Sequence, residues 1–160
     1  MKVAIVMGSY SDYEMGKKTE GVLQEFGVEV ETRILSAHRT PEEVRFLVSE
    51  EEEKGIEVYI AIAGMAAHLA GSLAAMTNRP VIGIPMKSDT LAGWDALLST
   101  VQMPSGVPVA TVAVNGMVNG ALLAVQILGL KYSELNGKMK AYKEEMRKGV
   151  LDKDQQIREG

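Results

Sequence analysis

The 160-residue chain is long enough to bury one hydrophobic core and too short for two independent catalytic domains. It has no cysteine, which excludes disulfides, thiolate nucleophiles and thiolate-bound metals, and its two histidines leave few ligands for a transition metal. A net charge of -4 argues against a nonspecific nucleic-acid-binding surface, and no apolar run approaches the ~20 residues that cross a bilayer. We therefore expect one cytoplasmic domain, residues 1–160, that binds neither nucleic acid nor membrane.

Short β-branched segments alternate with helical stretches, which predicts a parallel sheet covered by helices on both faces. Five such segments predict a flavodoxin-like three-layer α/β/α sandwich, with a strand order that the pattern leaves open. In a sheet of this kind, the loops after the strands meet at the carboxyl edge, where ligands bind. The expected strands are Lys2 to Met7, Val28 to Leu35, Val58 to Ala63, Val81 to Ile84 and Val107 to Val114.

The first expected strand ends in Gly8-Ser9-Tyr10-Ser11-Asp12, directly before a helix. The hydroxyls and exposed amides of this segment can hold a phosphate or a sugar, aided by the positive end of the helix dipole. Alternatively, Ser11 or Asp12 only caps the helix. The segment lacks the lysine of a Walker loop and the third glycine of a dinucleotide fingerprint, so neither nucleotide motif applies.

The second expected strand is followed by Ser36-Ala37-His38-Arg39-Thr40-Pro41. Thr40, Pro41 and Glu43 predict a capping box and a helix with proline at its first position. Arg39 offers bidentate binding to a phosphate, and His38 can take or give a proton near neutral pH. A solvated surface loop is the alternative, but the position at the same sheet edge as the first loop favours a ligand site.

A third loop, Ala63 to Gly71, joins the third strand to a helix through small residues. Small side chains leave backbone amides open to a flat ligand or a carboxylate, and they also permit close helix packing. For His68 in this loop we expect an internal structural role rather than proton transfer. The segment Gln102 to Val109 contains two prolines and a glycine, which predicts a rigid turn before the last strand.

The chain continues beyond a minimal five-strand sandwich, with helices expected at about Met117 to Leu130 and at about Ser133 to Val150. The second of these helices carries an apolar stripe, and no strand follows it. Such a stripe packs either on its own domain or on another subunit. We expect a homo-oligomer with residues 132–160 at a subunit interface. The stripe consists of Leu135, Met139, Tyr142, Met146 and Val150.

Four segments together resemble the family of N5-carboxyaminoimidazole ribonucleotide mutases, the bacterial-type PurE proteins. The likeness runs from Lys2 to about Leu130. It implies a flavodoxin-like sandwich assembled as an octamer, with no metal and no organic cofactor, that acts on a small ribonucleotide. The segments are Met7-Gly8-Ser9 with Ser11-Asp12, Ser36 to Pro41, Ala66-Ala67-His68-Leu69, and Val101 to Val109.

The resemblance implies a mutase of IMP biosynthesis that moves a carboxyl group from an exocyclic nitrogen to ring carbon four of an aminoimidazole ribonucleotide. His38 would then be the general acid and base. The phosphate and ribose would be bound by Ser9, Ser11, Asp12, Ser36 and Arg39. The imidazole and its carboxyl group would lie under Ala63, Gly64, Met65, Ala66, His68 and Leu69. Met65 and Ala70 depart from the family pattern, which has glycine and proline at these positions.

Two other functions are consistent with the chain. A second branch of the family carboxylates aminoimidazole ribonucleotide with free carbon dioxide, although the Ala66 to Leu69 and Val101 to Val109 segments resemble the mutase branch. The other alternative is a noncatalytic flavodoxin-like module, such as a flavin carrier or a phospho-receiver. A receiver needs acids after its first strand, where this chain has Gly8-Ser9-Tyr10.

Overall fold

The computed structural model describes residues 1–160, with every side chain except that of residue 52. Its centre is a parallel sheet in the order β2-β1-β3-β4-β5, which is the strand order of flavodoxin-like folds. The expected three-layer sandwich is confirmed. The strands are β1 (Lys2–Met7), β2 (Glu29–Ile34), β3 (Ile56–Gly64), β4 (Val81–Met86) and β5 (Ala110–Thr111).

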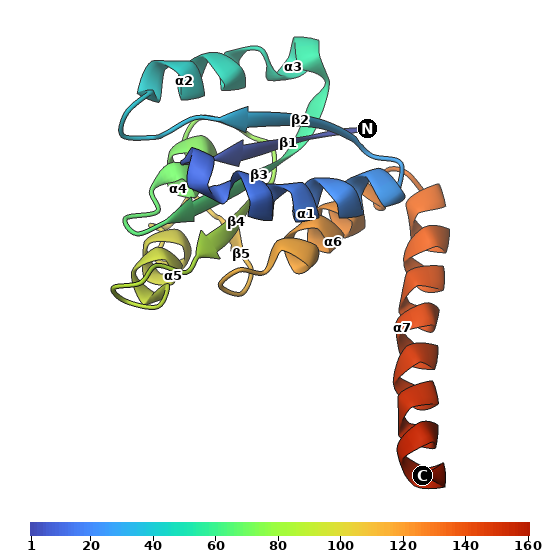
Figure 1. Cartoon of the computed structure of the whole chain (residues 1–160). Helices are drawn as coiled ribbons and strands as arrows, with labels where there is room; N and C mark the ends of the chain where they lie inside the picture. Colours follow the sequence, from blue (N-terminus) through green and yellow to red (C-terminus); the bar gives the residue numbers. More distant parts are fainter.

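Helices cover both faces of the sheet (Figure 1). One face packs against α1 (Tyr13–Glu25) and α6 (Met117–Leu128), with α1 preceded by a short 3₁₀ helix, η1 (Tyr10–Asp12). The other face packs against α2 (Pro41–Ser49), α4 (Leu69–Ala74) and α5 (Trp94–Val101). The short helix α3 (Glu51–Lys54) leads into β3, and α7 (Glu134–Glu159) ends the chain.

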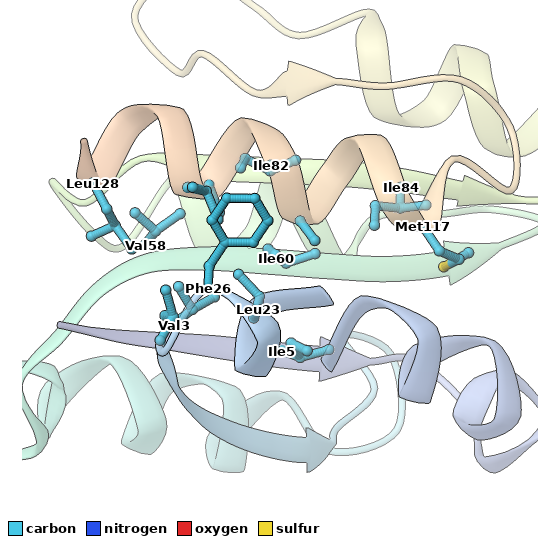
Figure 2. Close-up of a cluster of buried hydrophobic side chains, with 14 of the residues drawn as sticks. Val3, Ile5, Leu23, Phe26, Val58, Ile60, Ile82, Ile84, Met117 and Leu128 are labelled. Atoms are coloured by element: carbon cyan, nitrogen blue, oxygen red, sulfur yellow. The ribbon is translucent and has the colours of Figure 1, made fainter. Parts of the chain in front are cut away.

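Alternation of side chains along the central strands builds two cores, one on each face of the sheet. In β1, Ile5 belongs to the cluster under α1 and α6, whereas its neighbour Val6 belongs to the cluster under α2 and α4. Figure 2 shows the first cluster, in which Leu23 of α1, Phe26 just after α1, and Met117 of α6 lie over the strand side chains. Burial on both faces explains why these strands are nearly continuous apolar runs.

The fifth strand is much shorter than the sequence predicted. Only Ala110 and Thr111 pair with β4, whereas we expected a strand from Val107 to Val114. Pro108 has no N–H to donate to a ladder, and Gly106, with φ +95°, turns the chain just before it. The same residues make the Gln102 to Val109 segment a loop, as expected.

The predicted capping box at α2 is wrong, although the helix begins at Pro41 as expected. The Thr40 hydroxyl turns back toward the preceding loop instead of capping the helix. Its Oγ1 accepts the Ser36 N–H at 2.8 Å and donates to the Ser36 carbonyl at 3.2 Å. Thr40 therefore closes the loop that carries His38 and Arg39, because it bonds the residue that begins that loop.

The terminal helix α7 projects away from the sheet and its covering helices (Figure 1). Its 26 residues correspond to about 39 Å of helix, and they extend to Glu159, beyond the expected end at Val150. Leu135 and Met139 are buried in the core, and Tyr142 lies against Phe26 with ring centroids 5.8 Å apart. The far half of the stripe is exposed. None of the described helices is both long enough and apolar enough to span a membrane.

Candidate active site

A cavity of about 600 Å³ lies at the carboxyl edge of the sheet, between the loops that follow β1, β2, β3 and β4. This volume is in the usual range for a small-molecule site. Parallel strands bring these loops together although they are distant in the sequence. The cavity wall includes all of the predicted site residues: Ser9, Ser11, Asp12, Ser36, His38, Arg39, Ala63, Gly64, Met65, Ala66, His68 and Leu69.

The loop after β1 presents hydroxyls at the start of α1. The Ser9 side chain caps η1, because its Oγ accepts the Ser11 N–H at 3.3 Å and the Ser11 hydroxyl at 3.0 Å. Asp12 occupies the N-cap position of α1 but makes no capping bond with its side chain, so the alternative of a cap by Asp12 is wrong. Burial raises the pKa of the Asp12 carboxyl, and a hydrogen bond from Ser11 partly opposes that effect. These three side chains offer both donors and acceptors to a phosphate or a ribose.

The loop after β2 is tied to the loop after β1 through Arg39. The Arg39 Nη2 donates to the Gly8 carbonyl at 2.9 Å, and the Arg39 N–H donates to the Ser36 Oγ at 3.2 Å. Gly8 is itself fixed, because its N–H donates to the Ile62 carbonyl of β3 at 2.9 Å. The guanidinium is therefore held over the end of β1, and its other N–H groups are geometrically suited to an anion.

The two histidines of the chain meet in the cavity. The His38 Nε2 lies 2.9 Å from the His68 Nδ1, and the rings pack edge to face with centroids 4.9 Å apart. The His68 Nδ1 also lies 3.0 Å from the Ala66 carbonyl, which can only accept a hydrogen bond. The tautomer that satisfies both contacts has the proton on the His68 Nδ1, by assignment from this network. In that state the His38 Nε2 is an acceptor. We expected an internal structural role for His68, but its ring is exposed, and its contact with His38 was not predicted.

Met65 has an unusual backbone conformation at the cavity wall. Its φ of +55° lies in the left-handed region, which disfavours side chains and suits glycine. Its side chain is 66% exposed. This conformation gives a physical reason for the family preference for glycine at this position.

The sequence did not predict that the end of β4 would contribute to the site. Met86, Lys87 and Ser88 line the cavity, together with Gly8 and Ala37 from the other loops. Their position in the sequence could have indicated this role, because residues that directly follow a parallel strand lie at the ligand-binding edge of the sheet. Among the side chains that the structure describes, no group of three or more His, Asp or Glu is placed to hold a metal ion.

The strand order, together with a cavity of small-molecule size at the carboxyl ends of the strands, defines a flavodoxin-like α/β protein. The chain belongs to the AIR carboxylase family, whose model matches residues 2–149.

Two relatives and one solved structure show how closely the chain follows this family. It is 54% identical over 150 residues to the N5-carboxyaminoimidazole ribonucleotide mutase of Saccharolobus solfataricus, covering 94% of this chain and 95% of the relative. It is 52% identical over 156 residues to the mutase of the same name from Thermotoga maritima, covering 98% of this chain and 91% of the relative. The crystal structure of Treponema denticola PurE superimposes with a TM-score of 0.89 at 35% identity, covering 97% of each chain.

Proposed function

We propose that this chain is an isomerase that converts N5-carboxyaminoimidazole ribonucleotide to 4-carboxy-5-aminoimidazole ribonucleotide in IMP biosynthesis. The observation that carries the proposal is the His38–His68 contact in a cavity that Arg39 and a cluster of hydroxyls also line. A proton carrier and an anion-binding group thus face one space of ribonucleotide size. The relatives that carry the mutase name match nearly the whole chain.

In this proposal the loops after β1 and β2 bind the phosphate and the ribose. Arg39 provides charge, the Ser9 and Ser11 hydroxyls provide hydrogen bonds, and the dipole of the 13-residue helix α1 adds positive potential. The Asp12 carboxylate can accept hydrogen bonds from sugar hydroxyls but repels phosphate. We therefore assign Asp12 to the ribose.

The reaction breaks the C–N bond of the carbamate and forms a C–C bond at ring carbon four. His38 starts the reaction protonated, gives that proton to the nitrogen as carbon dioxide leaves, and later takes a proton from ring carbon four. The His68 Nδ1 donates to the neutral His38 that this first transfer leaves. His38 ends in the state in which it began, so the protons balance.

The released carbon dioxide has to stay beside the ring until the new bond forms. The loop after β3 offers small side chains, Ala63, Gly64 and Ala66, at the cavity wall. They allow a flat ring to approach the backbone closely, which leaves little room for water between them. Keeping the two reactants together makes recarboxylation effectively intramolecular.

The test of the mutase reaction is to mix purified protein with the carbamate ribonucleotide without added bicarbonate and to follow formation of the 4-carboxy product. We expect rapid conversion. The second candidate is direct carboxylation of aminoimidazole ribonucleotide, because the family description names that activity. Rapid turnover of aminoimidazole ribonucleotide with bicarbonate, together with no conversion of the carbamate, would establish the carboxylase instead.

The role of His38 is tested by His38→Asn. Loss of general acid–base catalysis typically lowers the rate by about 10²- to 10⁴-fold, and we expect a loss of this size with little change in ligand affinity. His68→Ala is the comparison variant, since it removes the contact but keeps His38, and it should lose less activity. A His38→Asn enzyme that keeps more than about a tenth of the wild-type rate would exclude the role.

We further propose that the chain works as a homo-octamer, the assembly that the family resemblance implies. Exposed apolar side chains support an assembly of copies, since Val150 of α7 is 67% exposed and Trp94 of α5 is 66% exposed. Eight chains of 17.3 kDa give about 138 kDa, which sedimentation would detect. A particle of 17.3 kDa at micromolar concentration would contradict the assembly. The cytoplasmic location stays a prediction.

A further inference from the structure

Lys87 lines the cavity, and the reaction as described leaves it without a role. It directly follows Met86, which pairs with Gly64 at the end of β3. Lys87 therefore lies beside the loop that begins at Met65, where we place the imidazole and its carboxyl group. Its side chain is exposed, and it forms no ion pair with any side chain that the structure describes.

The backbone at Lys87 is held in place by two hydrogen bonds that involve Asn115. The Lys87 N–H donates to the Asn115 Oδ1 at 2.9 Å, and the Asn115 N–H donates to the Pro85 carbonyl at 2.9 Å. Asn115 has φ +57°, a conformation that asparagine tolerates better than most residues. These two bonds clamp the chain just after β4, so the lysine projects from a fixed point.

The cavity has cations at two separate positions along the sheet edge. Arg39 is held over the end of β1 by its bond to Gly8, whereas Lys87 follows β4, and β3 lies between these strands. Two strand spacings correspond to about 10 Å. The proposed substrate also has two anionic ends, a phosphate and a carboxylate, separated by the ribose and the imidazole. When the phosphate binds at Arg39, the carboxylate at the opposite end of the substrate lies toward β3 and β4.

We propose that Lys87 binds the migrating carboxylate and thereby makes the site prefer carboxylated ribonucleotides over aminoimidazole ribonucleotide. This inference rests on the proposed function. The carboxylate is present in both the substrate and the product, so an ion pair with Lys87 stabilises both of them. Loss of the ion pair therefore raises KM more than it lowers kcat.

The test compares two ligands that differ only by the carboxylate: the 4-carboxy product and aminoimidazole ribonucleotide. Calorimetry in a His38→Asn background, which suppresses turnover, measures each Kd with and without Lys87→Gln. A hydrogen bond to a charged group corresponds to roughly tenfold to a hundredfold in affinity, and we expect that loss for the 4-carboxy ligand. Aminoimidazole ribonucleotide should bind with less than about a threefold change.

Two control variants separate this role from general electrostatics. Arg39→Gln should weaken both ligands alike, because both carry the phosphate. Lys18→Gln, which removes an exposed lysine of α1 outside the cavity wall, should change neither Kd. Equal weakening of both ligands by Lys87→Gln, or no weakening of the 4-carboxy ligand, would overturn the proposal. Wild-type turnover is measured separately, so failure of the mutase reaction is distinguishable from failure of the Lys87 assignment.

Discussion

Replacing Met65 by glycine should stabilise the protein relative to replacing it by alanine. The φ of +55° costs a residue with a Cβ about 1–2 kcal/mol, and both methionine and alanine bear that cost. Glycine avoids it, but its greater freedom in the unfolded chain costs about 0.4–1 kcal/mol. With the middle of each range, the net gain of glycine over alanine is about 0.8 kcal/mol. For a chain of this length, that gain raises Tm by about 1–4 °C.

The assay is calorimetric melting of wild type, Met65→Gly and Met65→Ala at one pH and one protein concentration. Alanine is the matched control, because it removes the same exposed side chain but keeps the Cβ. Since the Met65 side chain is 66% exposed, its removal should add little to either difference. If Met65→Gly melts at or below Met65→Ala, the left-handed backbone is not a source of strain and the reasoning is refuted.

Two further predictions concern stability. The Glu57 carboxylate accepts hydrogen bonds from Lys131 and Tyr132, each at 2.7 Å. Burial opposes its ionisation, but these bonds outweigh burial and hold the pKa of Glu57 below its usual value of 4.5. The ionised Glu57 therefore stabilises the fold fully above pH 4.5, and this stabilisation is lost as the pH falls through the lower pKa of the folded state. Glu57→Gln should cost about 1 kcal/mol of unfolding free energy at pH 7, and progressively less below about pH 4.5. Urea unfolding at several pH values checks this, and a pH-independent difference would contradict it. Gly83→Ala should cost about 1–3 kcal/mol in the same assay, because its Cβ would overlap the Thr100 Cγ2. Adding Thr100→Ser, which removes that methyl, should restore part of the loss, and no restoration would exclude the overlap as the cause.

The sheet was predictable because its strands are short apolar runs with clear ends. β1 begins and ends at the predicted residues, and β2 differs from its predicted range by one residue at each end. β5 was predicted too long because Val107 to Val114 has strand-like composition, whereas the proline and glycine in and before it limit its pairing with β4. Local composition cannot report which backbone groups have a partner on the neighbouring strand.

The loops of the site were also predictable, because each predicted segment directly follows a strand. The contact between His38 and His68 was not, since it joins loops from β2 and β3 across the end of β1. That contact depends on the strand order, which the sequence pattern left open. Thr40 shows the same limit on a smaller scale, because a hydroxyl suited to cap a helix bonds the preceding loop instead.

The cavity walls extend from Gly8 to Ser88, and four adjacent strands bring them together. Ligand binding is therefore linked thermodynamically to the pairing of β2, β1, β3 and β4 as one cooperative unit. A ligand at a hundred times its Kd adds about 2.7 kcal/mol to the free energy of opening that unit. Amide hydrogens deep in β1 and β3, far from any bound atom, should then exchange more slowly in the presence of ligand wherever exchange requires the unit to open.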